Sequence, residues 1–375
     1  MLLRRPPHLR GGRTRSPYEG DEMKPLLFTL AATLGLAACL DSPAAPGERE
    51  PTPPAPPTGT DPSVASQSTQ CPRRCLVRLS IEPGTYLMAL NEHAELVGTG
   101  HEVPFRWSKA TGLVRQYTTG EWLSLNSWHR QVAGNRAGKA VVWSDSGARV
   151  LTLPDMTYAE ARSINDWGRV VGTYHRRADN ATLAYRWSPW SGTTVLPSLS
   201  TQESAANDIN HANDAAGYSA AGGAKRAVLW PMAGGIRELG MLPGHVGSEA
   251  KAISNKGHVA VSSWPAGLTA VGTTRPRAAL WTEAGGLQPL GTLGGEISVP
   301  ADVNAWGEVV GTSTTADGQA HAFVWYPSTG MVRLDEGGAG RSKALAINSW
   351  GDIVGTLNDG ELVAWVWENN LWRWR

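Results

Sequence analysis

One layout of residues recurs seven times along this chain of 375 residues. It is clearest in the sixth copy, where residues 301–311 read Ala-Asp-Val-Asn-Ala-Trp-Gly-Glu-Val-Val-Gly, residues 321–325 read His-Ala-Phe-Val-Trp, and residues 330–334 read Gly-Met-Val-Arg-Leu. The Asn position recurs at 91, 126, 165, 210, 254, 304 and 348, with Ser at 254, and a Trp recurs at 107, 143, 187, 230, 281, 325 and 367. A period of roughly 43 residues with four short apolar runs matches one four-stranded blade. The repeat therefore predicts an all-β fold, a seven-bladed β-propeller.

The residues between the first two apolar runs predict a tight turn. In the seventh copy, residues 348–351 read Asn-Ser-Trp-Gly. The Asn side chain bonds the backbone two residues further on, and Gly at the fourth position accepts a positive φ. We interpret this Asn as a turn former. The Trp that recurs once in each copy is predicted to pack between adjacent blades, because a buried Trp removes roughly 150 to 250 Å² from water.

Composition agrees with a single strand-rich domain over residues 71–375. The chain has 43 Gly, 25 Pro and 17 Trp, which favour turns and strands over helices. Its formal net charge is only +1, so no overall field draws it to nucleic acid. A nucleic-acid partner is therefore not expected.

The first 39 residues contain an export signal. Met23-Lys24 precedes an apolar run over 25–38 that is too short to span a bilayer, and the run ends in Leu-Ala-Ala-Cys at 36–39. This ending resembles the bacterial lipobox, which implies that Cys39 is lipidated and becomes the first mature residue. An ordinary cleaved secretory signal is the alternative. Because the apolar run begins so far into the chain, we interpret residues 1–22 as a start-site artefact.

Residues 40–70 are predicted to be a disordered tether. They are dense in Pro, Ala, Ser and Thr, a composition that buries little apolar surface and favours extended polyproline II. Leu40 follows the predicted lipidated Cys39, where the enterobacterial sorting rule reads Asp as an inner-membrane signal. The resemblance to that rule implies the outer membrane, with the lipid on Cys39 as the membrane contact.

Two further cysteines stand where the tether ends, in Cys71-Pro-Arg-Arg-Cys75. In an oxidising compartment a close pair of this kind predicts a disulfide. The spacing is not that of Cys-x-x-Cys redox catalysts, and no neighbouring His or second Cys pair suggests zinc. A loop this short removes little chain entropy, so a Cys71–Cys75 bond would stiffen the chain only locally.

The repeat resembles the bacterial extracellular HAF family, named after the tripeptide found here at 321–323. The resemblance runs from about Leu87 to the end of the chain and is strongest in the sixth and seventh copies. The tripeptide occurs only in this copy; other copies read differently, as in Pro104-Phe105. Membership implies repetition and an extracellular location, and it implies no general activity.

In four-stranded blades alternate connections lie on opposite faces, so the long variable loops are expected to share one face. Variable loops on a rigid scaffold usually carry function. The residues predicted to form a binding face there are His175, Arg176, Arg177, Asp179, His245, Trp264, Arg275 and Arg277.

Motifs of catalysis and metal binding are absent from the sequence. It contains no Gly-x-Ser-x-Gly, His-Glu-x-x-His or Gly-x-x-x-x-Gly-Lys segment, and we expect neither metal nor cofactor. We therefore predict a binding or scaffold module for a protein or a cell-envelope glycan. The alternatives are a propeller hydrolase or lyase acting on glycan or peptide, whose site would be assembled from several blades, and a passive structural lipoprotein.

The two ends of the repeat region predict how the ring closes. Residues 76–79 read Leu-Val-Arg-Leu, like the fourth strand of the sixth copy, and residues 371–374 have a similar pattern. We expect residues 76–80 to lie beside the seventh blade, with both termini competing for or sharing its edge. Pairing the two ends would remove an exposed seam from the ring.

Overall fold

The computed structural model describes residues 35–36, 74–79, 81, 85–100, 103–115, 120–200, 203–266, 275–335, 340–358 and 360–374. Cys39, Cys71 and the predicted tether lie outside the described residues. Cys75 is described and is buried.

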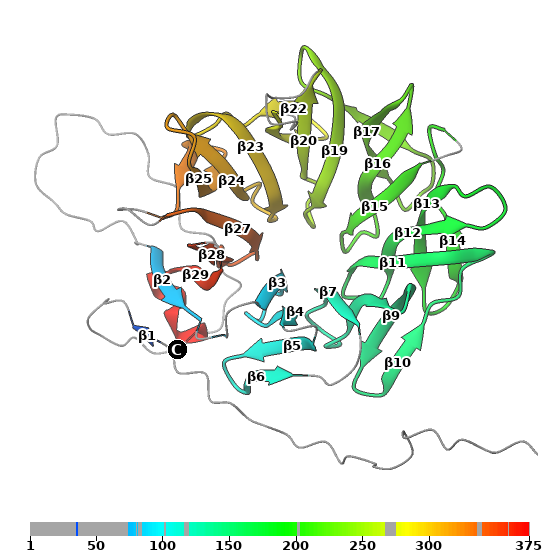
Figure 1. Cartoon of the computed structure of the whole chain (residues 1–375), viewed down its shortest axis with the longest axis horizontal. Coiled ribbons are helices and arrows are strands. Elements are labelled where there is room, and N and C mark those ends of the chain that lie inside the picture. Colours follow the sequence, from blue (N-terminus) through cyan, green and yellow to red (C-terminus); the bar gives the residue numbers. More distant parts are fainter. Residues whose placement is uncertain are drawn as a thin grey trace, which may run out of the picture.

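Seven four-stranded antiparallel sheets surround a central axis, as the repeat predicts (Figure 1). Blade 1 consists of β3 (Thr85–Leu90), β4 (Leu96–Gly100), β5 (Val103–Ser108) and β6 (Gly112–Arg115). Blade 2 consists of β7 (Glu121–Leu125), β8 (Val132–Arg136), β9 (Lys139–Ser144) and β10 (Gly147–Val150). Blade 3 consists of β11 (Met156–Ile164), β12 (Val170–Arg176), β13 (Thr182–Ser188) and β14 (Gly192–Val195). Blade 4 consists of β15 (Ser204–Ile209), β16 (Ala215–Ala221), β17 (Ala224–Trp230) and β18 (Arg237–Gly240).

The remaining blades follow in chain order. Blade 5 consists of β19 (His245–Ile253), β20 (Val259–Pro265), β21 (Arg277–Thr282) and β22 (Gly286–Pro289). Blade 6 consists of β23 (Gly294–Val303), β24 (Val309–Thr315), β25 (Ala320–Tyr326) and β26 (Gly330–Arg333). Blade 7 consists of β27 (Ser342–Ile347), β28 (Ile353–Leu357), β29 (Glu361–Trp367) and, from the other end of the chain, β2 (Arg74–Arg78). A two-residue strand, β1 (Gly35–Leu36), pairs with the outer side of β2; it belongs to the predicted export signal, so cleavage before Cys39 would remove it.

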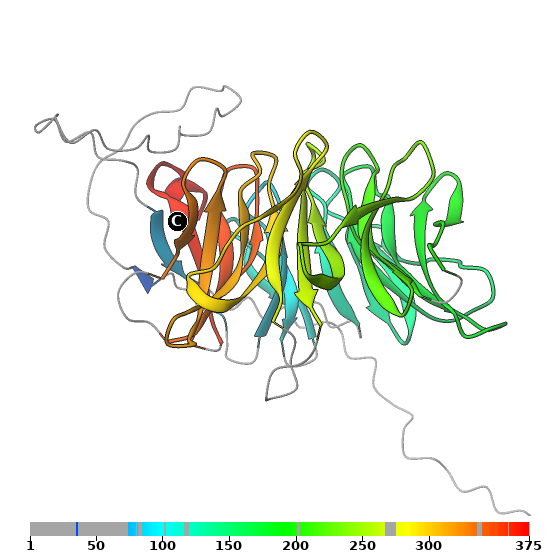
Figure 2. The same ribbon diagram turned by 90° about the horizontal axis from the view of Figure 1, so that it is seen from above.

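The blades form a flat disc whose strands run between two faces (Figure 2). We call the face that carries the turns between the first and second strands and between the third and fourth strands the turn face. The opposite face, which carries the longer connections, is the loop face. The first strand of every blade lies nearest the central axis (Figure 1).

The core consists of seven apolar clusters, and each of them joins two adjacent blades. The recurring Trp of the third strand is buried in the first six blades, as predicted. In blade 7 the predicted position is wrong. Ile353 pairs with Trp365 as Val309 pairs with Trp325, so Trp365 occupies the repeated site. β29 continues two residues further, to a half-buried Trp367 that pairs with Arg74 of β2.

Hydrogen bonds also join the blades near the loop face. The hydroxyl oxygens of Ser204, Ser248, Ser298 and Ser342, in the first strands of blades 4 to 7, accept backbone N–H groups from the third strand of the preceding blade at 2.8 to 3.0 Å. Each serine is buried, so the bond satisfies a backbone group that water cannot reach.

The ring closes through the N-terminal strand. β2 pairs with β29 from Arg74↔Trp367 to Arg78↔Val363, and the Leu79 N–H donates to the Leu362 carbonyl at 2.9 Å. This confirms the predicted place of the strand for the residues described. The other expectation, a strand at the C-terminus, is wrong: residues Glu368–Arg373 form the 3-10 helix η1. Because β2 already occupies the edge of blade 7, the C-terminus packs across the seam between blades 7 and 1.

Candidate functional site

The eight residues predicted for the loop face fall into two groups on different blades. His175, Arg176, Arg177 and Asp179 lie at the connection between β12 and β13 of blade 3. His245, Trp264, Arg275 and Arg277 lie at or beside the ends of β19, β20 and β21 in blade 5. Blade 4 lies between them, and no hydrogen bond or ion pair among the described residues joins the two groups.

Charges in the blade 3 group neutralise one another locally. Arg176 and Asp179 form an ion pair at 2.6 Å, and the hydrogen bond from Arg176 lowers the pKa of Asp179 to about 2. Arg177 lies 4.0 Å from Asp155. This is the behaviour of solvated loop residues.

The blade 5 group is also locally paired. His245 Nδ1 is 2.8 Å from Ser263 Oγ, and burial lowers the pKa of His245. Arg275 pairs with Glu296 at 3.2 Å, and the Arg277 guanidinium donates to the Gly295 carbonyl at 3.3 Å. Trp264 is half-buried.

A cavity of about 280 Å³ lies instead on the central axis at the turn face. It is lined by the ends of all seven first strands and the turns after them, within residues 88–92, 123–127, 162–166, 207–211, 251–255, 301–305 and 345–349. Because each blade contributes the same register positions, differences between the copies decide the chemistry of this cavity.

The recurring Asn frames this end of the axis. In the seventh copy Asn348 Oδ1 accepts the N–H groups of Trp350 and Asp352 at 3.1 and 3.0 Å, which confirms that the Asn forms the turn. In six blades the Asn Nδ2 also donates to the backbone carbonyl of the equivalent residue in the next blade, at 2.9 to 3.3 Å. This second role of the Asn was not predicted from the sequence.

Blade 5 has Ser254 at this position, and Ser254 has no amide to donate. Its hydroxyl oxygen still accepts the N–H groups of Lys256 and His258, at 3.3 and 3.1 Å. The imidazole of His258 bonds the backbone of Asn304 in the next blade. His258 therefore bridges the one seam that the amides leave open.

The wall of the cavity is polar on one side. Arg162 donates to Asn207 Oδ1 at 2.6 Å, Asn207 donates to Glu249 Oε1 at 3.0 Å, and Lys251 pairs with Glu249 at 3.1 Å. These residues belong to blades 3, 4 and 5. The corresponding lining residues of the other blades are apolar: Met88, Leu123, Ala301 and Leu345.

Two buried carboxylates, one in blade 4 and one in blade 6, bond backbone across the blade seams. Asp208 and Asp302 accept the N–H groups of Ile253 and Ile347, each at 2.8 Å. Burial raises the pKa of both, and for Asp302 it does so to about 7, with further contributions from Asp208 and Glu92.

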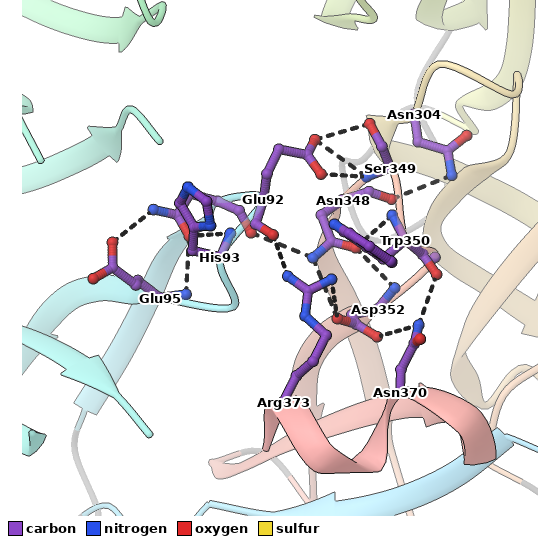
Figure 3. A network of polar contacts seen from close by, with 12 residues as sticks. Glu92, His93, Glu95, Asn304, Asn348, Ser349, Trp350, Asp352, Asn370 and Arg373 are labelled. Atoms are coloured by element: carbon purple, nitrogen blue, oxygen red, sulfur yellow. Dashed lines mark hydrogen bonds and ion pairs between the residues drawn. The ribbon is translucent and has the colours of Figure 1, made fainter. Parts of the chain in front are cut away.

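Glu92 closes the seam between blades 7 and 1 (Figure 3). Its carboxylate accepts the Ser349 hydroxyl at 2.9 Å and the Ser349 N–H at 3.0 Å. Burial raises the pKa of Glu92, against the hydrogen bonds from Ser349. Arg373 donates to the Glu92 carbonyl, and its guanidinium lies over the Trp350 ring, 4.5 Å from the centroid.

At the rim between blades 3 and 4, His211 is held by a buried carboxylate. His211 Nε2 lies 2.9 Å from Asp166 Oδ2, and Asp166 Oδ1 accepts the Ser127 N–H at 2.6 Å. Burial raises the pKa of Asp166, but the hydrogen bonds from His211 and Ser127 outweigh it, so this pKa is lowered. The half-exposed imidazole is thus fixed at the mouth of the cavity.

Exposed tryptophans surround the same rim. The second residue after the recurring Asn is Trp128, Trp167, Trp306 or Trp350 in four of the blades. Trp128 is 61% exposed and Trp167 47%, and the two rings meet edge to face at 5.7 Å beside His211. This cluster was not among the residues predicted from the sequence. The available signal was the Trp two residues after the recurring Asn, a position that a turn does not require to be aromatic.

Two kinds of feature are lacking in the part of the chain that the structure describes. No group of three or more His, Cys, Asp or Glu side chains there is arranged to hold a metal ion. Within the same ranges, no helix has the length and apolar character needed to cross a membrane.

The sequence matches no protein-family model and no curated protein. Solved structures with a similar fold include a streptogramin B lyase, with a TM-score of 0.51, 13% identity, and coverage of 79% of this chain and 98% of that one. A catalytically inactive virginiamycin B lyase from Staphylococcus aureus, solved with quinupristin, has a TM-score of 0.51 at 10% identity, covering 78% and 99%. At these identities the similarity shows the propeller fold alone.

Proposed function

We propose that this protein is a membrane-tethered, extracytoplasmic binding module of the HAF-repeat kind, and that it binds an envelope ligand on the turn face. The observation that carries the proposal is the cluster of Trp128, Trp167 and His211 at the mouth of the central cavity. Large, well-exposed aromatic side chains that lie together are unusual on a surface that binds nothing.

The cluster is already held in place without a ligand. The Trp167 indole N–H donates to the His211 carbonyl at 3.0 Å, and Asp166 bonds both the His211 ring and the backbone of the turn that carries Trp128. A surface that is rigid before binding loses less conformational entropy when it binds. Aromatic anchors of this kind dominate the binding energy of many interfaces.

The predicted N-terminal segment supports the location. A lipid on Cys39 would hold the chain at the membrane, and an extended tether of about thirty residues spans up to roughly 90 Å at about 3.1 Å per residue. The propeller would then reach ligands well away from the bilayer surface.

The Asp166–His211 pair favours one second candidate, a hydrolase or lyase. With Nε2 turned to the carboxylate, the neutral ring carries its proton there and presents Nδ1 as a base. Under this alternative His211→Ala would abolish turnover of the ligand while the tryptophans still bound it. Under the binding proposal the bound ligand is recovered chemically unchanged.

Photocrosslinking in cells tests the binding proposal. A photoreactive phenylalanine analogue is placed at Trp128 or Trp167, with Val246 on the loop face as the control position, since it is 43% exposed. We expect one adduct species from both turn-face positions and none from Val246. Equal capture at position 246, or no adduct at either tryptophan position, would contradict binding at the aromatic cluster.

A further inference from the structure

Two arginines lie together at the seam between blades 3 and 4, next to the Trp167 turn. Arg169 follows that turn, and Arg186 lies in β13. Their Nη1 atoms approach the same atom, the Met232 sulfur, at 3.7 and 3.6 Å. Two guanidinium groups are therefore directed at one point on the turn face.

This pair has no anionic partner among the described residues. Neither arginine forms an ion pair there, and both Nε atoms are buried without a hydrogen-bond acceptor. Arg186 donates to the Trp230 carbonyl at 2.8 Å, while Asp214 Oδ1 accepts the Met232 N–H at 2.8 Å. Burial and the charge of Arg169 lower the pKa of Arg186, although Asp214 acts in the opposite direction.

In blade 1 the two positions equivalent to Arg169 and Arg186 carry opposite charges. Glu95 and Arg169 each donate their backbone N–H to the recurring Asn of their own turn, at 2.9 and 3.0 Å. Arg106 pairs with Val97 across the sheet as Arg186 pairs with Val171. In blade 1 the two side chains form an ion pair at 2.5 Å. Blade 3 has replaced the carboxylate with a second arginine.

A thioether is a weak acceptor for two guanidinium groups. Met232 is 46% exposed, and methionine is flexible, so an incoming oxyanion can displace it and accept stronger, charge-assisted hydrogen bonds. The Trp190 ring lies beside Arg169, 5.9 Å from its guanidinium carbon, and is 72% exposed. A ligand bound to the arginines can therefore also stack on a flat aromatic face.

We propose that Arg169, Arg186 and Trp190 bind the carboxylate and ring of an acidic sugar in an envelope polysaccharide. The inference rests on the proposed function, because it names the ligand class for the turn face. A sugar ring needs only an open indole face beside the arginines. An apolar peptide anchor would need a pocket to fill, and the cavity of about 280 Å³ lies on the central axis instead.

The test uses the full chain, purified from membranes in detergent, and isothermal titration with hexagalacturonate. Its methyl ester and hexaglutamate serve as comparison probes. We expect binding of hexagalacturonate at least tenfold tighter than binding of either other probe, and weakened by salt. Equal binding of acid and ester would overturn the proposal, and so would tighter binding of hexaglutamate, which would assign the site to acidic peptides.

Arg169→Glu restores the charge pair of blade 1 and should fold, with a melting temperature equal to or above that of the parent. We expect it to lower the affinity for hexagalacturonate at least tenfold. Met232→Ala, which clears the site, should bind at least as tightly as the parent. Arg177→Glu makes the same change in net charge on the loop face, where the residue's side chain is 71% exposed, and should bind normally. An equal loss in both charge-reversed variants contradicts a specific site.

Crosslinking separates this proposal from the broader one. The photoreactive residue at position 128 is combined with Arg169→Glu. If it still captures the ligand at the parental yield, turn-face binding stands and the acidic-sugar assignment is wrong. If hexagalacturonate binds through Arg169 while neither tryptophan position captures anything, the acidic-sugar site stands and the aromatic cluster is not the binding surface.

Discussion

The Asn348 side chain donates from Nδ2 to the backbone carbonyl of Asn91 at 3.3 Å, across 257 positions of sequence. The bond joins the last blade to the first at the turn face, at the seam where Glu92 also bonds Ser349 (Figure 3). Each Asn therefore does two things: it shapes its own hairpin and joins its blade to the next. Because the ring is closed, no blade presents an open face at either end of the repeat series.

Asn348→Ala should lower the free energy of unfolding by about 2 to 4 kcal/mol, because it removes two turn hydrogen bonds and the bond to Asn91. Asn348→Ser is the matched variant, since Ser254 already supports the same turn in blade 5. We expect Asn348→Ser to lower the free energy of unfolding by less than Asn348→Ala does. Urea unfolding followed by tryptophan fluorescence measures both. Equal losses would mean that the turn hydrogen bonds contribute nothing, because both variants lose the bond to Asn91.

Deleting residues 71–80 should destabilise the whole ring by several kcal/mol. The deletion uncovers the edge of β29 and removes the buried Val77 and Leu79, which contribute roughly 1.5 to 3 kcal/mol each. Arg78→Ala is the control, because its ion pair with Glu361 is solvent-exposed and worth less than about 1 kcal/mol. A truncated chain that melts like the parent would show that β2 does not close the ring.

Trp374→Ala should cost about 3 to 5 kcal/mol. Trp374 is fully buried and stacks on Trp107 of blade 1 with the ring centroids 5.6 Å apart, so it holds the C-terminal end across the last seam. Trp372 is 66% exposed, and Trp372→Ala should change stability by only about 0.5 kcal/mol. Thermal unfolding of the two variants side by side distinguishes specific packing from a general need for the helix η1.

The contribution of Asp302 to the free energy of unfolding should decrease as the pH rises from about 4 to about 7. Its pKa in the folded protein is about 7, above the ordinary value of 3.8, so the native state holds a proton that the unfolded state has released. The unfolded state then binds fewer protons in this window, and the free energy of unfolding decreases with pH. Above pH 7 the loss is complete.

Asp302→Ala isolates this contribution. Ala already occupies the equivalent position in blades 1, 5 and 7, at Ala89, Ala252 and Ala346. The parent should lose on the order of 2 to 4 kcal/mol more than the variant between pH 4 and pH 8. Parallel stability curves for the two proteins would show that Asp302 does not titrate in this range. The raised pKa values of Glu92 and Asp208 also make the free energy of unfolding decrease with pH, and they do so in both proteins.

Cys39→Ser should move the protein from the membrane fraction to the soluble fraction and abolish labelling with a fatty-acid analogue. The reason is that the predicted lipid is attached through the Cys39 thiol. Mutation of Cys75, which lies outside the lipobox, is the control and should leave labelling intact. Labelling that persists without Cys39 would contradict the lipoprotein prediction.

Much of the fold could be predicted from local chemistry. The Asn-x-x-Gly turns, the apolar runs and the buried tryptophans repeat at one register, and each blade meets only its neighbours, so a local pattern repeated seven times specifies the ring. The entry of residues 76–79 into blade 7 was also predictable, because those residues look like an outer strand without a blade of their own. In blade 7 the predicted position of the recurring Trp was wrong. Trp365 and Trp367 lie two positions apart in one strand, and only the pairing with Ile353 shows which of them occupies the repeated site.

The candidate site, unlike the fold, could not be predicted from the repeated local pattern. Loop length pointed to the loop face, where the structure pairs Arg176 with Asp179 and Arg275 with Glu296 of the next blade. The turn-face cluster depends on which blades stand side by side: Asp166 meets His211 across 45 positions of sequence, and Arg169 meets Arg186 and Met232 at a seam between two repeats. By itself the sequence determined the blade, its repetition and its closing strand, because these follow from hydrogen bonding and burial within one repeat. Only the tertiary structure decided which charges are neutralised and which are left open, because a charge is balanced by its neighbours in space.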